Sequence, residues 1–286
     1  MVILISQADV YFKQQIQEIL NNGYNDEEYE VRPTWPDGKK AHSKYITHSI
    51  FTWDNSMGVP IQTVRKIAWK AGLKEILALY QQRATTKEEF EQAGVFWWSP
   101  WFDDKGTLGK SYAYQLKKEI EFPEGKFNQI DRVIWLLKNK PMDRRIITNM
   151  LNLEEMKDMT LPPCAFMTMW SVRGKYLDMM LIQRSGDLLP AAGFGGVNTI
   201  QYYFLWQIIS QVTGYEPGKF THFINNLHIY DRHENIAKDL LNAPTYPSPT
   251  FVIDKEITDF YAFSADSISL EGYQWHTDIK NIPIAE

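Results

Sequence analysis

The chain has a single cysteine, Cys164, among its 286 residues. One thiol excludes an intrachain disulfide and every metal site built from several cysteines, and no metal is expected. Because disulfides accumulate in oxidising compartments, their exclusion favours a reducing, cytoplasmic setting. The same thiol is free for chemistry, which makes Cys164 the first side chain to consider as a nucleophile.

The sequence also lacks a long apolar run and an excess of basic charge. No stretch approaches the ~18 apolar residues of a membrane span, and no basic leader precedes Asp9, so neither a membrane helix nor a signal peptide is expected. Lysine and arginine number 30 against 35 acidic residues, and the formal net charge of -5 argues against non-specific nucleic-acid binding. The composition does not exclude binding of a small anionic ligand by a few arginines.

No internal repeat, low-complexity linker or break in composition divides the sequence, which predicts a single domain over residues 1–286. A hydrophobic content of 44% with 14% aromatics is enough for a large core. Periodicity and composition predict regular elements and one aromatic-rich loop: helices at 9–22, 63–82 and 198–213, a strand at 47–54 and the loop at 94–115. The mixture predicts an α/β (α+β) fold.

Two strongly β-forming segments, FMTMWSV and YLDMMLI, are joined by Arg173-Gly174-Lys175 and predict a β-hairpin. Cys164 stands at the mouth of the first strand, and Arg184 and Asp187 end the second. The hairpin therefore brings a guanidinium and a carboxylate near the thiol, and a neighbouring guanidinium lowers the pKa of a thiol. On its own, Cys164 is better explained as a small buried apolar side chain; its neighbours favour a nucleophile.

Two further pairs each have a structural and a functional explanation. Arg144 and Arg145 are typical of a solvated face, although arginine is the side chain best suited to bidentate phosphate recognition. His228 and Tyr230 would share one face of a strand. They suit either a polar strand edge or the binding of a ribose hydroxyl.

Six motifs together give the sequence a family resemblance. They are KEIL, DRRIIT, PPCAF, QRSGD, Asn198 four residues before Tyr202, and LHIYDRH. In this order and spacing they resemble thymidylate synthase, from about Tyr24 to the C-terminus. The resemblance implies a mixed sheet flanked by helices, and a homodimer whose subunits pack sheet against sheet.

The resemblance also implies roles for individual residues. Cys164 would add to carbon 6 of a pyrimidine nucleoside monophosphate, so that carbon 5 attacks the methylene of 5,10-methylenetetrahydrofolate. The other catalytic side chains would be Glu75, Tyr112, Asn198 and Asp187. The nucleotide would be bound by Arg32, Gln183, Arg184, Ser185, His228 and Tyr230, and by Arg144 and Arg145 donated across the dimer interface. The folate would contact Trp98, Trp101, Asp187 and Ala285. Neither a membrane nor an obligatory nucleic acid is implied.

The sequence departs from the family pattern around the base and the folate. The departures are Ala78 for a tryptophan, Ala165 for a frequent histidine, a longer segment at 190–197, Asn225-Asn226 for Gly-Asp, and Glu286 for an apolar C-terminal residue. Several of them predict a wetter site, in which water attacks the methylene on carbon 5 and gives a hydroxymethyl group.

The departures lead to a ranking of four functions. The prediction placed first is therefore a hydroxymethylase that converts dUMP into 5-hydroxymethyl-dUMP. An ordinary thymidylate synthase comes second and a dCMP or CMP hydroxymethylase or methylase third, because Asn198 suits uracil better than cytosine. From a different class, an inactive nucleotide- or RNA-binding homologue also remains open.

Overall fold

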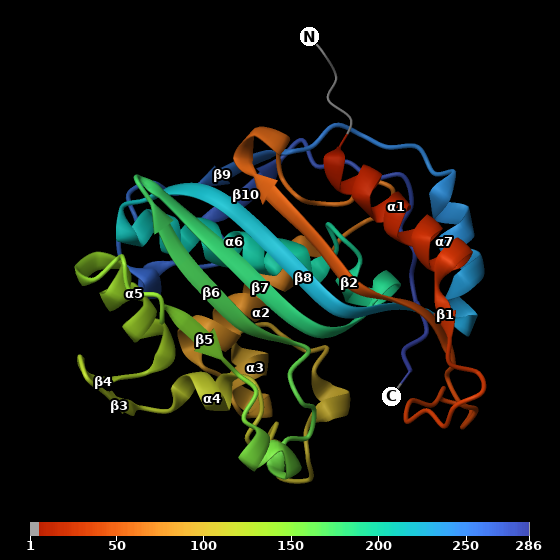
Figure 1. Ribbon diagram of the computed structural model, residues 1–286, viewed down its shortest axis with the longest axis horizontal. Coiled ribbons are helices and arrows are strands. Elements are labelled where there is room, and N and C mark those ends of the chain that lie inside the picture. The colour runs from red at the N-terminus through yellow and green to blue at the C-terminus, as the bar shows by residue number, and fades with distance from the viewer. Residues whose placement is uncertain (1–5, 286) are drawn as a thin grey trace.

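The computed structural model describes residues 6–285, so Glu286 lies outside the described residues. Its centre is a six-stranded mixed sheet in the order β1-β2-β8-β7-β6-β5 (Figure 1). Neighbouring strands are antiparallel except β7 and β8, which run parallel. The strands of this sheet are β1 (Tyr24–Asn25), β2 (Ser43–Asp54), β5 (Ile147–Asn149), β6 (Ala165–Arg173), β7 (Tyr176–Asp187) and β8 (Glu216–Tyr230). The strand predicted at 47–54 is confirmed within β2.

Helices cover one face of the sheet, as the predicted fold class requires. They are α1 (Gln7–Asn22), α2 (Trp69–Leu77), α3 (Lys87–Gln92), α4 (Ala113–Lys117), α5 (Gln129–Asn139), α6 (Val197–Thr213) and α7 (Glu234–Leu241). Shorter helical turns are η1 (Asn55–Met57), η2 (Ala78–Gln82), η3 (Ser99–Trp101), η4 (Leu153–Asp158), η5 (Leu188–Ala192), η6 (Asp231–His233) and η7 (Phe260–Ala262). Two small hairpins complete the fold: β3 (Ile120–Phe122) with β4 (Gly125–Phe127), and β9 (Thr250–Ile253) with β10 (Ile268–Glu271).

The α6 helix is the crossover between the parallel strands β7 and β8 and lies behind the sheet in Figure 1. It is apolar on nearly every side, which is typical of a helix buried between a sheet and another helix. The α2 helix packs against it. The helix predicted at 198–213 is confirmed.

The amphipathic helix predicted at 9–22 is also confirmed, as α1. Its apolar stripe, which includes Phe12, Ile16 and Ile19, is fully buried. The helix packs against α7 and β2 at one edge of the sheet. These side chains belong to the second of two clusters of buried apolar side chains.

The helix predicted over 63–82 is wrong in its first turns, since α2 begins only at Trp69. Apolar residues in this stretch match a helical period, but their backbone groups bond elsewhere. The N–H groups of Thr63 and Val64 donate to the buried carboxylate of Asp9 at 2.8 and 3.2 Å. A contact to a residue so distant in sequence cannot be read from local periodicity.

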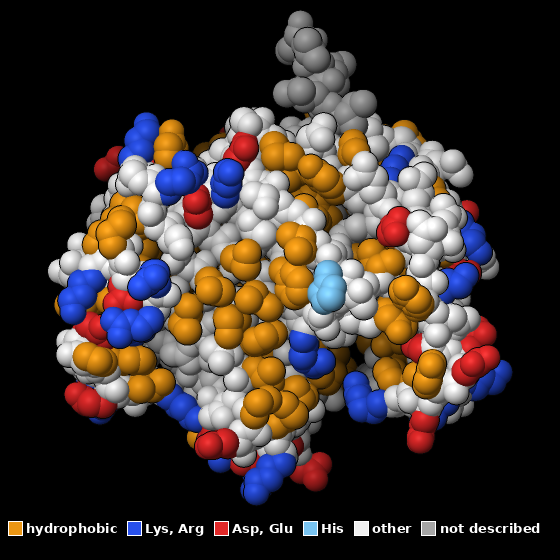
Figure 2. Space-filling model, in the orientation of Figure 1, with side chains coloured by type: hydrophobic (Ala, Val, Ile, Leu, Met, Phe, Trp, Pro, Cys, Tyr) orange, Lys and Arg blue, Asp and Glu red, His pale blue; other side chains and the backbone are white. Residues whose placement is uncertain are grey.

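The hairpin predicted from the two β-forming segments is confirmed by β6 and β7, with Ala165 opposite Gln183 and Arg173 opposite Tyr176. The face of the sheet turned away from α6 has no layer over it among the described residues. Figure 2 shows hydrophobic side chains spread over this face, and Ile50, Met169 and Met180 are 58%, 40% and 38% exposed. A sheet face this apolar is suited to a partner surface.

Candidate active site

Cys164 lies directly before β6, where the hairpin brings Arg184 of β7 against it. The Arg184 backbone N–H donates to the Cys164 carbonyl at 2.9 Å, and Arg184 Nη2 is 3.6 Å from Cys164 Sγ. Arg184 Nε and Nη2 also donate to the carbonyls of Pro163 and Pro162 at 3.0 and 2.8 Å. The predicted meeting of guanidinium and thiol is confirmed.

Arg184 lowers the pKa of the thiol, as expected, but burial outweighs this effect. Burial raises the pKa of Cys164, and the nearby charges of Arg184 and Arg32 and the hydroxyl of Tyr112 lower it without cancelling that rise. The resting form is therefore the thiol. Both arginines favour the thiolate once it forms.

Tyr112 stands at the start of α4 with a φ of 44°, in the left-handed region that non-glycine residues seldom adopt. The Cys164 backbone N–H donates to Tyr112 Oη at 3.2 Å. The Tyr112 ring packs edge to face on Trp98, with ring centroids 4.8 Å apart. Because burial raises its pKa, Tyr112 stays a protonated phenol.

Glu75 lies on α2 and is surrounded by neutral hydrogen-bond donors. Trp97 Nε1 donates to Glu75 Oε2 at 2.6 Å. Burial raises the pKa of Glu75, while hydrogen bonds from Trp97, Gln201 and Trp98 lower it. Trp97 was not predicted as a partner of Glu75; the only signal in the sequence was its place in a tryptophan-rich loop.

Asn198 lies in the first turn of α6, with Gln183 of β7 beside it. Gln183 Nε2 donates to Asn198 Oδ1 at 3.2 Å, and the Gln183 side chain is buried. Gln183 in turn bonds to the buried His222 on β8, at 2.9 Å. His222 was also missed, although it lies an even number of residues before His228 on the same strand and so shares its face.

Asp187 ends β7 and pairs with a histidine that the sequence did not single out. Its Oδ1 is 3.3 Å from His233 Nδ1, and His233 Nε2 is 2.7 Å from the Pro283 carbonyl. Burial alone would lower the pKa of His233, but Asp187 and the Pro283 carbonyl raise it overall. His233 thus ties the C-terminal segment, which includes Ala285, to the Asp187 carboxylate.

His228 and Tyr230 lie at the end of β8 with ring centroids 4.8 Å apart, on one face of the strand as predicted. His228 Nδ1 is 2.9 Å from Asn226 Oδ1. Burial lowers the pKa of His228 and raises that of Tyr230 to about 12, so both are neutral near pH 7. The pair presents uncharged donors and acceptors, as sugar hydroxyls require.

The arginines divide into two groups. The charges of Arg184 and Arg32 act on the Cys164 thiol, and Ser185 follows Arg184 on β7. Arg144 and Arg145 are exposed, and Arg145 Nη2 is 2.6 Å from Asp143. Neither is among the charges that shift the pKa of Cys164.

The two tryptophans predicted to contact folate lie together in the aromatic loop. Trp98 and Trp101 pack edge to face with centroids 5.8 Å apart. Trp98 is 5% exposed and Trp101 is half-buried. They form one apolar wall next to Tyr112.

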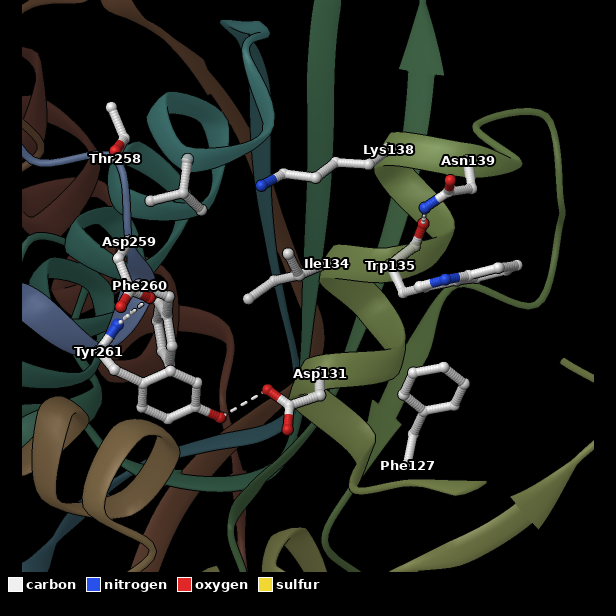
Figure 3. Close-up of a pocket in the computed structure, with 11 residues that line it drawn as sticks. Phe127, Asp131, Ile134, Trp135, Lys138, Asn139, Thr258, Asp259, Phe260 and Tyr261 are labelled. Atoms are coloured by element: carbon white, nitrogen blue, oxygen red, sulfur yellow. Dashed lines mark hydrogen bonds between the residues drawn. The ribbon is translucent and has the colours of Figure 1, made fainter. Parts of the chain in front are cut away.

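Two surface cavities lie apart from this constellation. The one in Figure 3, about 270 Å³, is lined by α5 and the 258–261 segment, where Tyr261 Oη donates to Asp131 at 2.6 Å. The other, about 770 Å³, includes Arg145 among its lining residues. Cys164 lines neither, so the hydrogen bonds and charges around the thiol identify the site better than cavity size.

Residues 6–285 contain neither a metal-binding cluster nor a membrane-spanning helix. No group of three or more His, Cys, Asp or Glu side chains is arranged to hold a metal ion within that range. Within the same range, no helix has the length and apolar character needed to cross a membrane.

Comparison with known proteins gives consistent matches over nearly the whole chain. A family model described as Thymidylate synthase matches residues 10–285. Thymidylate synthase 1 of Bacillus spizizenii is 36% identical over 272 residues, covering 94% of this chain and 96% of that protein. The thymidylate synthase of Clostridium beijerinckii is 37% identical over 265 residues, covering 92% and 93%.

A solved structure extends the similarity to three dimensions. Thermostable thymidylate synthase A from Bacillus subtilis matches with a TM-score of 0.91 at 34% identity, covering 97% of this chain and 99% of that chain. The fold, the family model and the relatives agree, and the chain belongs to the thymidylate synthase family.

Proposed function

We propose that this enzyme, as a single catalytic domain over residues 1–286, transfers a one-carbon unit from 5,10-methylenetetrahydrofolate to carbon 5 of dUMP. The observation that carries the proposal is the setting of Cys164. Its Sγ lies 3.6 Å from the Arg184 guanidinium, and its backbone N–H bonds to Tyr112. A thiol between a cation and a protonated phenol suits nucleophilic addition to an electron-poor ring.

Carbon 5 of uracil is too weak a nucleophile without this addition. When Cys164 Sγ bonds to carbon 6, the C5=C6 double bond breaks and its electron pair moves onto carbon 5 and the conjugated carbonyl. Carbon 5 then bonds to the methylene that the folate supplies, and both bonds from this methylene to the folate nitrogens break, with their electron pairs staying on nitrogen. Loss of the carbon 5 proton accompanies the second cleavage and leaves a methylene group on carbon 5. After that group has reacted, cleavage of the S–C6 bond and return of a proton to sulfur restore the ring and the thiol.

Two side chains assist the proton transfers. Glu75 organises water near the ring, since its carboxylate is held by neutral donors. Tyr112 helps to remove the carbon 5 proton. Because its pKa is raised, the phenol acts as a hydrogen-bonding group that holds the accepting water.

The nucleotide is held by groups from several elements. Asn198 pairs with the ring, and His228 and Tyr230 bind the sugar hydroxyl. Arg32, Arg184 and Ser185 hold the phosphate from within one chain. The charges of both arginines already act on Cys164, which supports placing the nucleotide beside the thiol.

We propose a homodimer in which Arg144 and Arg145 of each chain complete the phosphate site of the other. Two observations support it. Both side chains are exposed and do not act on their own chain's thiol. The open sheet face carries exposed Ile50, Met169 and Met180, which a second copy would cover.

The folate site draws on Trp98, Trp101, Asp187 and Ala285. The fit is supported by the apolar wall of the two tryptophans and by the partly exposed Asp187 carboxylate, which suits the N–H groups of a pterin. The His233 contact keeps the C-terminal segment near this carboxylate. The folate supplies the one-carbon unit, and these residues orient it and exclude water.

The product depends on which group reacts with the methylene after it has bonded to carbon 5. Hydride from tetrahydrofolate gives a methyl group and dihydrofolate, whereas addition of water gives a hydroxymethyl group and tetrahydrofolate. Ala78 is fully buried, and so is Phe194 in the altered 190–197 segment, which argues against a path for water at these two positions. We therefore place dTMP first.

The second candidate is 5-hydroxymethyl-dUMP, which the sequence departures ranked first. The observation that favours it is Asn226, which faces His228 at 2.9 Å where the family usually has an aspartate. The phage deoxycytidylate hydroxymethylases resemble this chain in carrying an uncharged residue there, and they differ from it at the base-reading position, which here is Asn198. Glu286, the other departure at the folate, lies outside the described residues.

One experiment separates these outcomes. The purified enzyme is given dUMP tritiated at carbon 5 and methylenetetrahydrofolate, and tritium release is compared with dihydrofolate formation. Equal amounts support dTMP, and tritium release without dihydrofolate supports 5-hydroxymethyl-dUMP. Absence of both, with no covalent adduct to 5-fluoro-dUMP and folate, would reject the proposal in favour of an inactive nucleotide- or RNA-binding homologue.

A further inference from the structure

We propose that His222 is a positioning residue that sets the preference for uracil over cytosine, by fixing through Gln183 which way the Asn198 amide faces. This inference rests on the proposed function, because it takes Asn198 as the side chain that reads the base. His222 itself lies on β8 behind the site and is 1% exposed. His222 acts through a chain of hydrogen bonds, and for each bond the donor and the acceptor can be identified.

The direction is first set at Gln183. Its Nε2 is 3.0 Å from the backbone carbonyl of Ser185, which can only accept. The amide nitrogen therefore faces Ser185, and the amide oxygen faces the other way. That oxygen lies 2.9 Å from His222 Nε2, which must carry the proton.

The other ring nitrogen of His222 is consequently an acceptor. Burial lowers the pKa of His222 to about 3, so the ring is neutral and carries one proton. Its Nδ1 is 3.3 Å from Thr199 Oγ1. That hydroxyl accepts from the Gly195 backbone N–H at 3.2 Å, which leaves its own proton free to donate to His222.

The chain continues from Gln183 into the site. The second N–H of Gln183 Nε2 donates to Asn198 Oδ1 at 3.2 Å, which fixes the amide oxygen on that side. Asn198 Nδ2 then donates to Gln201 Oε1 at 3.2 Å. Gln201 Nε2 is buried without a hydrogen bond of ordinary geometry, and the same amide lowers the pKa of Glu75.

Every hydrogen bond thus runs one way, from the Gly195 N–H at one end to Gln201 Oε1 at the other. The direction cannot be reversed, because the Gly195 backbone N–H only donates and the Ser185 carbonyl beside Gln183 only accepts. Turning the Asn198 amide over would set oxygen against oxygen at Gln201 and nitrogen against nitrogen at Gln183. The loss of such buried hydrogen bonds is costly.

This direction matters for the base. Asn198 has one N–H and one oxygen lone pair left, and these match O4 and N3–H of uracil. Cytosine has an amino group and a bare N3 at the same positions, so it would need the reversed amide. The structure therefore opposes cytosine through residues that do not touch the base.

The test measures equilibrium binding of dUMP and dCMP to the full-length protein without folate. In His222→Phe the Gln183 oxygen loses its donor, and we expect the preference for dUMP to fall about tenfold or more. His222→Gln can donate to the same oxygen and should retain most of the preference. The control is Phe220→Leu, which perturbs the ring stacked on His222 but no link of the chain.

Three results would overturn the inference. They are an unchanged preference in a folded His222→Phe protein, no rescue by His222→Gln, and an equal loss in Phe220→Leu. A direct measurement does not depend on any variant folding. Nitrogen NMR of the ¹⁵N-histidine wild type, with the His222 signals assigned by their loss in His222→Gln, should show His222 neutral at pH 5 with its proton on Nε2, and a proton on Nδ1 would refute the chain.

The same data separate this inference from the proposed function. If wild type binds dUMP well and discriminates, but His222→Phe does so equally, only the role of His222 fails. If wild type binds neither nucleotide, the proposed function fails and the selectivity role falls with it. The NMR result then still reports whether the chain of hydrogen bonds runs as described.

Discussion

The indole N–H of Trp97 donates a hydrogen bond to Glu75 Oε2 at 2.6 Å, although the Trp97 side chain is 39% exposed. An exposed tryptophan normally finds water for this group. Here it bonds to a carboxylate that burial already disfavours in its charged form. Trp97 therefore favours the charged form of Glu75 against the effect of burial and covers the carboxylate at the same time.

Replacing Trp97 with phenylalanine keeps the aromatic cover and removes the donor. We expect the pKa of Glu75 to rise further, since a hydrogen bond that favours the charged carboxylate is lost. The acid limb of the kcat/KM profile should move to higher pH by the same amount. Phe96→Leu, a change at the 62% exposed neighbour, is the control and should leave the limb in place. If the acid limb did not shift in Trp97→Phe, the Trp97 hydrogen bond would have no effect on the pKa of Glu75.

Cys164→Ser should abolish turnover while leaving dUMP binding nearly intact, because the phosphate and sugar contacts lie on other residues. We expect a loss of at least about 10⁴-fold in kcat, the scale seen when a nucleophile is deleted. Binding is measured by calorimetry and turnover by tritium release. If the variant kept activity within about tenfold of wild type, Cys164 would not be the nucleophile.

The proposed exchange of arginines can be tested with mixed dimers. An Arg145→Ala chain and a Cys164→Ala chain should each be nearly inactive alone. Refolded together in equal amounts, they should recover about a quarter of wild-type activity, because half of the dimers are mixed and each mixed dimer has one complete site. No recovery, with mixed dimers shown to form, would mean that Arg145 serves its own chain.

His233 predicts how pH affects the C-terminal segment. Its pKa is raised in the folded protein, so its contribution to stability is complete below the unfolded value of about 6.5 and is lost as pH rises through the folded value. The segment held through Pro283 should therefore become more susceptible to carboxypeptidase between neutral and alkaline pH. His233→Gln should abolish this pH dependence. A wild-type cleavage rate that does not change with pH would contradict the prediction.

The elements predicted correctly are those whose signal is local. The stripe of Phe12, Ile16 and Ile19 and the two β-forming segments around Gly174 need only neighbouring residues to be recognised. The pairing of Cys164 with Arg184 followed from the hairpin for the same reason. Residues 63–68 failed because their backbone donors bond to distant partners, Thr63 and Val64 to Asp9 and Lys66 to Thr277, which a helical period does not reveal.

The parts of the site that were missed depend on tertiary contacts. Trp97 meets Glu75 across 22 positions, and His222 meets Gln183 across 39. The net rise of the Cys164 pKa was also missed, because it depends on burial by segments remote in sequence. The motifs indicated which residues share a site, and the structure was needed to show how they support one another.

The way Arg184 is held has a consequence for the thermodynamics of binding. Three of its five N–H groups are already donated, one from Nε to Pro163 and two from Nη2 to Pro162 and Cys164 Sγ, so only the two on Nη1 remain for a phosphate. A free arginine gives up about 2 kcal/mol of conformational entropy when a ligand immobilises it. Arg184 loses this freedom on folding, so the nucleotide meets a guanidinium that is already rigid.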